Sequence, residues 1–344
     1  MSSNGPTHDG GSSLRGEHPA MMDGQDLTVF CQLRDWLDQD EQVWLCTIVA
    51  TSGSSPRPVG AMLGVTPSHQ IGSLSGGCVE EDLIEKLRSG ELDLSTPMRV
   101  EYGVSAEENE RLGLPCGGRL DILIETLTQE DLDWLTDAIG ALESRRATGR
   151  RLDLTTGKSV IEKHSPNAVI TLDDKAIIQS LGPQMRMLLV GAGQLAQVLS
   201  QLAVAMDYQV IVTDTRPEVL NQWAGPTVTL IEGLPDDVIS EHAVDQHSLI
   251  ITLTHDPRID DMALLEALDS PAWYVGALGS LKTTRGRLQR LRALGLSEQQ
   301  LARLRAPVGL DIGSKTPWEI AVAIMAEITR ERKRSANAKG PYQH

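Results

Sequence analysis

The chain has 344 residues, 40% of them hydrophobic, which is enough for about two globular domains with ordinary cores. Its formal net charge is −16, because 47 Asp and Glu residues outnumber 31 Lys and Arg residues. This acidic balance argues against a general nucleic-acid binder, which would carry a basic surface. No apolar run approaches the ~20 residues that a membrane-spanning helix needs.

The amino-terminal segment 1–24 is rich in Ser, Gly, His and Asp and shows no apolar periodicity. It lacks the apolar stretch of a secretory signal peptide. We therefore expect a disordered leader and a cytoplasmic protein that contacts neither membrane nor nucleic acid.

Residues 25–150 are expected to form an α+β domain of mixed strands. Apolar residues at helical spacing predict a helix within 27–37, and short apolar runs predict several strands after it. The first strand leads into a loop in which Ser54 and Ser55 supply hydroxyls and Arg57 a guanidinium. Such groups favour an anion, which arginine clamps in a bidentate manner. A turn-rich connector with a solvated arginine is the alternative.

The four cysteines form no Cys-x-x-Cys pair, which argues against a zinc knuckle. Cys78 follows Gly76 and Gly77 and opens a predicted helix, where unpaired N–H groups would lower the pKa of its thiol. Cys116 precedes Gly117 in a second glycine loop. These cysteines are either functional thiols lining one pocket or small residues in two tight turns.

Residues 184–330 are expected to form a doubly wound parallel sheet of the Rossmann type. An apolar run ends at Gly191, and Gly193 and Ala196 complete a Gly-x-Gly-x-x-Ala pattern before a predicted helix. Asp214 ends the next predicted strand about 20 residues later, where an acid would meet a ribose hydroxyl. This order predicts a site for a phosphate or nucleotide, with an emptied site as the alternative.

Two further groups follow predicted strands of this sheet, where ligands of open α/β sheets bind. His255 and Asp256 are candidates for proton transfer, although Asp256 also fits a helix cap. Gly279 and Ser280 suit either an anionic group or the start of a helix. Segment 151–183 is expected to connect the two domains through short strands and turns, and 331–344 to be a polar tail.

Taken in order, these motifs resemble the XdhC/CoxI family of molybdoenzyme maturation factors over residues 28–330. The motifs that carry the resemblance occupy residues 53–60, 76–80, 116–118, 191–193, 254–258, 276–280 and 307–313. The resemblance implies a chaperone that binds the molybdenum cofactor (molybdopterin), protects it, and assists its sulfuration and insertion into a xanthine dehydrogenase-type hydroxylase. The resemblance implies that this molybdoenzyme is a partner of the chain. A cysteine desulfurase is a second candidate partner, and a homodimer is left open.

The resemblance also implies roles for individual residues. Arg57 and the nearby hydroxyls would hold phosphate or pterin, and Cys78 or Cys116 would guard or ligate the cofactor's molybdenum, while the protein itself holds no metal. Family members commonly carry His where this chain has Gln194, which argues against acid–base work there. The candidate cofactor-binding residues are Ser54, Ser55, Arg57, Gly76, Gly77, Cys78, Cys116, Gly117, Gly191, Gly193, Asp214, Gly279 and Ser280.

Two other functions stay open at this point. An NAD(P)-dependent oxidoreductase would use the Rossmann-like domain, with His255 as its acid–base residue. A docking scaffold would bind a hydroxylase without touching the cofactor. Whether the protein is an enzyme is thus undecided from the sequence, although a non-catalytic chaperone is favoured; the catalytic candidates are Cys78, Cys116, His255 and Asp256.

Overall fold

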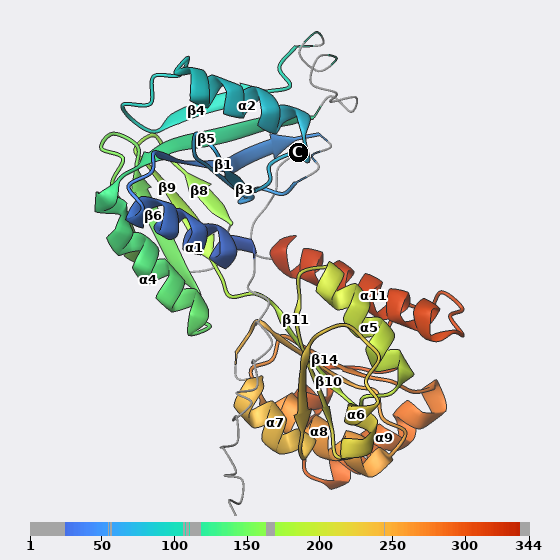
Figure 1. The fold of residues 1–344 in the computed structure, drawn as a ribbon. Coiled ribbons are helices and arrows are strands. Elements are labelled where there is room, and N and C mark those ends of the chain that lie inside the picture. Colours follow the sequence, from blue (N-terminus) through green and yellow to red (C-terminus); the bar gives the residue numbers. More distant parts are fainter. Residues whose placement is uncertain are drawn as a thin grey trace, which may run out of the picture.

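The structure, a computed structural model, describes residues 25–53, 55, 57–105, 107, 110, 118–162, 169–243 and 245–337. Two antiparallel sheets with their helices form the amino-terminal half, and a parallel sheet between helices forms the carboxyl-terminal half (Figure 1). This arrangement confirms the predicted fold class. None of the helices in the described ranges combines the length and apolarity that a bilayer crossing requires.

The first sheet has five antiparallel strands in the order β3-β2-β1-β5-β4. Its strands are β1 (Val43–Ser52), β2 (Met62–Val65), β3 (Gln70–Gly72), β4 (Met98–Tyr102) and β5 (Arg119–Leu127). Helix α2 (Cys78–Ser89) packs on one face. Helices α1 (Gln25–Asp38) and α4 (Leu132–Glu143) pack on the other, the latter preceded by the 3₁₀ turn η1 (Gln129–Asp131).

Alternate side chains of β1 serve these two faces because successive residues of a strand point in opposite directions. Cys46 and Ile48 join the core under α2, whereas Leu45 joins the core under α1 and α4. A central strand covered on both sides is therefore apolar almost throughout, as its sequence shows.

A second antiparallel sheet follows, in the order β7-β6-β9-β8. Its strands are β6 (Thr148–Asp153), β7 (Ser159–Glu162), β8 (Ile170–Leu172) and β9 (Ala176–Leu181). Arg150 of β6 joins the two sheets, since its guanidinium donates to both carboxylate oxygens of Glu125, at 3.0 and 2.5 Å. The segment expected to connect the domains thus contains most of a sheet, and β6 crosses the boundary placed at residue 150.

The parallel sheet has six strands in the order β12-β11-β10-β13-β14-β15, the arrangement of a Rossmann domain. Its strands are β10 (Arg186–Val190), β11 (Gln209–Asp214), β12 (Thr229–Glu232), β13 (Ser248–Thr252), β14 (Tyr274–Ala277) and β15 (Leu304–Arg305). The short helix α6 (Pro217–Asn221) follows β11. Because the order reverses between β10 and β13, the loops after these two strands border the expected ligand crevice.

Helices cover both faces of this sheet, as Figure 1 shows. Helices α5 (Gln194–Ala205) and α11 (Pro317–Asn337) pack on one face. The other face carries α7 (Pro235–His242), α8 (Pro257–Asp269), α9 (Leu281–Ala293) and α10 (Glu298–Leu301). Helix α11 begins with a capping box, because Glu319 N–H donates to Thr316 Oγ1 at 3.3 Å and Thr316 N–H to the Glu319 carboxylate at 2.9 Å.

Candidate functional site

The glycine loop after β10 has the predicted strand–turn–helix geometry. Gly191 adopts φ +103°, and a Cβ there would lie 3.0 Å from Thr254 Cγ2 and 3.3 Å from the Thr254 nitrogen. Gly193 precedes the first residue of α5, and a Cβ there would meet nothing within 4 Å. Only Gly191 therefore requires glycine for the tight turn, whereas Gly193 leaves the helix start open.

The carboxylate of Asp214 forms hydrogen bonds with other residues of the Rossmann domain. Its carboxylate accepts a hydrogen bond of 2.9 Å from the Ala192 N–H and two of 2.9 Å from the Arg216 guanidinium. Burial raises the pKa of Asp214, but the hydrogen bonds from Arg216 and Ala192 outweigh it and hold that pKa below its usual value. The hollow bordered by Gly191, Asp214 and Thr254 measures only about 10 Å³. These contacts give NAD(P) binding no support.

The other candidates at this edge of the sheet cap helices. Asp256 caps α8 by accepting from Arg258 N–H at 2.9 Å, and its side chain pairs with the Arg258 guanidinium at 2.8 Å. The side-chain hydrogen bond from Arg258 lowers the pKa of Asp256 to about 2. His255 beside it is exposed. Asp256 therefore has the role of a helix cap, which the sequence offered as the alternative to proton transfer.

Gly279 and Ser280 open helix α9. Ser280 Oγ accepts from Thr283 N–H at 3.1 Å, which makes Ser280 the N-cap. Gly279 adopts φ +155°, and a Cβ there would lie 3.3 Å from the Thr283 side chain. The structure thus shows the helix start that the sequence offered as the alternative to an anion contact.

In the amino-terminal half, the side chain of Glu80 in helix α2 reaches back to the loop before Cys78. Its carboxylate accepts hydrogen bonds from the backbone N–H groups and hydroxyls of the preceding loop: Ser73 Oγ, Leu74 N, Ser75 N and Oγ, Gly76 N and Gly77 N. Burial raises the pKa of Glu80, but these hydrogen bonds outweigh it and hold the pKa far below its usual range. Glu80 itself is only 5% exposed.

This contact changes the role of the glycines before α2. Gly76 and Gly77 adopt φ +90° and +155°, and their N–H groups point at a carboxylate of the chain rather than at an external anion. Cys78 is the first residue of α2, one residue before the predicted start at Val79, while its side chain is outside the described set. Sequence reasoning missed the role of Glu80, although a Glu three residues after a helix N-cap is the spacing of a capping box.

Several predicted site residues lie outside the described ranges: Ser54, Cys116 and Gly117. Ser55 is described, and its hydroxyl donates to the Arg57 carbonyl at 2.7 Å, which shapes the loop locally. Arg57 itself lines a cavity. Of the predicted anion-binding loop, Arg57 is thus the residue that the structure connects to a larger site.

That cavity, about 560 Å³ in volume, lies between the two halves of the chain. Its walls are α1, segment 57–62, the end of α4 and β9 on one side, and Arg186, Asp207 and Gln209 on the other. Arg186 and Gln209 begin β10 and β11, so the cavity borders the amino-terminal edge of the parallel sheet. The glycine loop lies at the opposite edge, about 13 Å along β10. Small-molecule sites span about 300–1,000 Å³.

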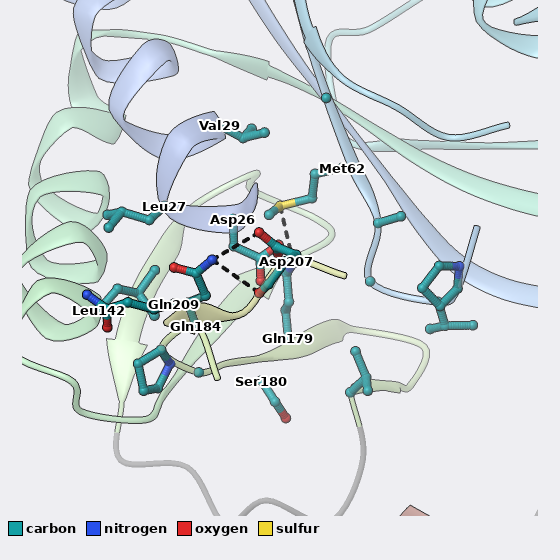
Figure 2. Close-up of a pocket in the computed structure, with 18 of the residues that line it drawn as sticks. Asp26, Leu27, Val29, Met62, Leu142, Gln179, Ser180, Gln184, Asp207 and Gln209 are labelled. Atoms are coloured by element: carbon teal, nitrogen blue, oxygen red, sulfur yellow. Dashed lines mark hydrogen bonds between the residues drawn. The ribbon is translucent and has the colours of Figure 1, made fainter. Parts of the chain in front are cut away.

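Figure 2 shows how the polar side chains lie in this cavity. Asp26 of α1 is next to Asp207, which belongs to the turn between α5 and β11. Gln184 Nε2 donates to the carbonyl of Asp207 at 3.1 Å and to its Oδ1 at 3.0 Å. Gln179 Nε2 approaches Met62 Sδ at 3.3 Å. The spacing patterns of the sequence gave no signal for this cluster, because its residues come from distant segments.

The family to which this chain belongs is shown by its similarity to known proteins. Residues 187–328 match the XdhC Rossmann domain, and residues 36–103 match the XdhC and CoxI family. A Bacillus subtilis protein, named as a probable subunit of xanthine dehydrogenase, is 30% identical over 327 residues, which cover 87% of this chain and 96% of that relative. The chain belongs to the XdhC and CoxI family.

Other relatives support this membership. The Escherichia coli protein named molybdenum cofactor insertion chaperone PaoD is 26% identical to this XdhC/CoxI chain over 293 residues, 84% of this chain and 83% of PaoD. The crystal structure of a protein described as a xanthine dehydrogenase from Bacillus halodurans superposes with a TM-score of 0.70 at 25% identity. It covers 91% of this chain and 98% of that one, so the likeness spans both halves.

Metal-ligating side chains are not grouped in the part of this XdhC/CoxI chain that the structure describes. No three His, Cys, Asp or Glu side chains converge there in a way that would hold a metal ion. Cys46 is buried in the core of the first sheet, and burial raises the pKa of its thiol above the ordinary value.

Proposed function

We propose that this protein binds the molybdenum cofactor, protects it, and assists its sulfuration and insertion into a xanthine dehydrogenase-type molybdenum hydroxylase. The observation that carries the proposal is the similarity to PaoD, which is named a molybdenum cofactor insertion chaperone and matches 84% of this chain. The 560 Å³ cavity supports it, because a pterin with a phosphate is of the size that such cavities hold. The cofactor is cargo here, and its molybdenum belongs to the cargo.

Arg57 is proposed to hold the phosphate or pterin, since it lines the cavity. Cys78 is proposed to guard or ligate molybdenum, because its backbone opens helix α2, where N–H groups stabilise a thiolate. Cys116 stays an equal candidate from the sequence. A cysteine desulfurase as partner and a homodimer are likewise predictions of the sequence alone.

The test is capture of cofactor released anaerobically from a molybdoenzyme. The purified full chain should carry molybdenum and pterin in equal amounts through gel filtration. Cys78→Ser and Cys116→Ser should reduce the molybdenum retained, while Cys31→Ser, in helix α1, provides the matched control. If neither molybdenum nor pterin co-elutes with the wild-type chain, the proposal is wrong.

A second experiment separates the chaperone from a docking scaffold. The loaded chain is mixed with cofactor-free hydroxylase, and activity of the hydroxylase is followed with and without a cysteine desulfurase. A chaperone should activate the client only when it is loaded. Binding of the client that is indifferent to loading, without activation, would favour the scaffold.

A further inference from the structure

The cavity between the two halves contains a buried cation that has no carboxylate counterion among the described residues. Arg186 is 8% exposed, and its guanidinium donates to Gln209 Oε1 at 2.9 Å and to the His242 carbonyl at 2.6 Å. Among the described residues, Arg186 forms no ion pair with a carboxylate. Burial, and then the charge of Arg145, lower the pKa of Arg186 to about 10, against the opposing effect of Asp245. An anion beside Arg186 would relieve this cost.

The neighbouring arginine does not offer the same opportunity. Arg145 donates to both oxygens of Asp245, at 2.6 and 3.1 Å, and to the Gln184 carbonyl at 3.1 Å. Its charge is therefore already matched by a carboxylate. Of these two arginines, Arg186 is the one whose charge an external anion would balance.

The cavity also contains two acids that repel each other. Burial raises the pKa of Asp26 to about 6, with the charge of Asp207 adding to the rise and that of Arg57 opposing it. Figure 2 shows Asp26 and Asp207 close together in the cavity, although they come from its opposite walls. Asp207 already accepts from Gln184 at 3.0 Å. A ligand that presented N–H donors to Asp26 would stabilise its ionised form.

One class of ligand supplies both an anion and such donors. A 2-amino-4-oxopyrimidine ring carries an amino group next to a ring N–H, and this pair donates two parallel hydrogen bonds to one carboxylate. A phosphate carries the negative charge that a guanidinium binds in a bidentate manner. Both can fit together in 560 Å³.

We propose that the cavity binds a ligand with a 2-amino-4-oxopyrimidine ring and a phosphate, with Asp26 accepting the ring's N–H donors and Arg186 holding the phosphate. The inference rests on the proposed function, because the pterin of the molybdenum cofactor is such a ligand. Guanine nucleotides share both features, so the experiment must separate these two sources. The ligand then lies at the amino-terminal edge of the parallel sheet, away from the Gly191 loop.

The test is equilibrium binding of three probes to the full chain under anaerobic conditions: metal-free molybdopterin, GMP and inorganic phosphate. Asp26→Asn should weaken molybdopterin roughly tenfold or more, because an amide offers a donor where the ring needs an acceptor, and should leave inorganic phosphate unchanged. Arg186→Gln should weaken both molybdopterin and phosphate by a similar factor, and Arg186→Lys should weaken them less. Arg258→Gln, an exposed arginine at the opposite edge, is the matched control.

The possible outcomes distinguish the proposed binding site from the proposed function. Binding of molybdopterin that survives Asp26→Asn and both Arg186 variants overturns the site and leaves the proposed function standing. Binding of GMP alone, lost in the same variants, supports the cavity and overturns the proposed function. If the wild-type chain binds none of the probes, both are overturned. Thermal unfolding of each variant shows that it is folded, and if Arg186→Gln is not, Asp26→Asn and Arg186→Lys decide.

Discussion

Glu80 and Asp26 are buried or half-buried acids in the same half of the molecule, and their surroundings are opposite. Glu80 is surrounded by backbone N–H groups and hydroxyls of its own loop, which hold its pKa far below the usual range. Asp26 faces a second carboxylate, and burial and that charge raise its pKa to about 6. The loop supplies the first acid with hydrogen-bond donors, whereas the second, among the described residues, lies next to a like charge.

This contrast extends to the other glycine loop. Asp214 accepts the Ala192 N–H and the Arg216 guanidinium, as Glu80 accepts the N–H groups before α2. Two loops whose sequences resemble anion sites are thus closed by carboxylates of the chain itself. Among the described residues, Arg186 has no carboxylate partner and Asp26 lies next to the like charge of Asp207, and both line the cavity where the two halves meet.

The largest expected effect is at Glu80. Glu80→Ala removes the acceptor for the N–H groups of Leu74 to Gly77, and the free energy of unfolding at pH 7 should fall by about 3–5 kcal/mol. Since the folded-state pKa of Glu80 is lowered, its stabilisation is present above the unfolded pKa near 4.3 and is lost as pH falls through the folded one. Urea unfolding across pH measures this. Equal stability of Glu80→Gln and the wild-type protein would contradict it.

The second expected effect separates the two glycines of the Rossmann loop. Gly191→Ala should lower the free energy of unfolding by about 2–3 kcal/mol, because φ is +103° and the new Cβ would press on Thr254. Gly193→Ala is the matched control, since its Cβ would meet nothing within 4 Å. Thermal unfolding of both variants checks this, and equal losses would argue against the described turn.

The third expected effect concerns Asp26 in the cavity, where removal of the charge should raise the free energy of unfolding instead of lowering it. The folded-state pKa of Asp26 lies above its unfolded value, so the wild-type protein loses stability as pH rises from about 4 to about 6 and does not regain it above. Asp26→Asn should therefore be more stable than wild type by about 1–2 kcal/mol at pH 7.5 and similar to it below pH 4. Unfolding in urea at both pH values is the measurement. A variant less stable at pH 7.5 would show that Asp26 is satisfied within the fold.

The smallest effect is expected at Asp214. Asp214→Asn keeps one acceptor oxygen for the Ala192 N–H and weakens the pairing with the exposed Arg216, so the loss should be about 1 kcal/mol. Urea unfolding at pH 7 measures it. A loss as large as that of Glu80→Ala would mean that the two glycine loops depend on their acids equally.

The fold class and many local features were predictable from patterns in the sequence. Apolar runs, helical spacing and turn residues are local signals, so the Rossmann strand–turn–helix at Gly191, the start of α2 at Cys78 and the capping box at Thr316 were predictable. Hydrogen bonds within a few residues of one another settle these features, and all their participants are visible in one stretch of sequence. The alternative roles of Asp256 and Ser280 as helix caps belong to the same class.

The pairing of buried charges became visible only in the folded arrangement. Asp26 is far from Arg186 and Asp207 in the chain and meets them only because α1 packs near the amino-terminal edge of the parallel sheet. Whether a buried charge finds a partner depends on that packing, since the cost of burial and the field of neighbouring charges are set by distance in space and not in sequence. The sequence therefore indicated sites at the glycine loops, whereas the buried Arg186 and the neighbouring acids Asp26 and Asp207 lie in the cavity between the halves.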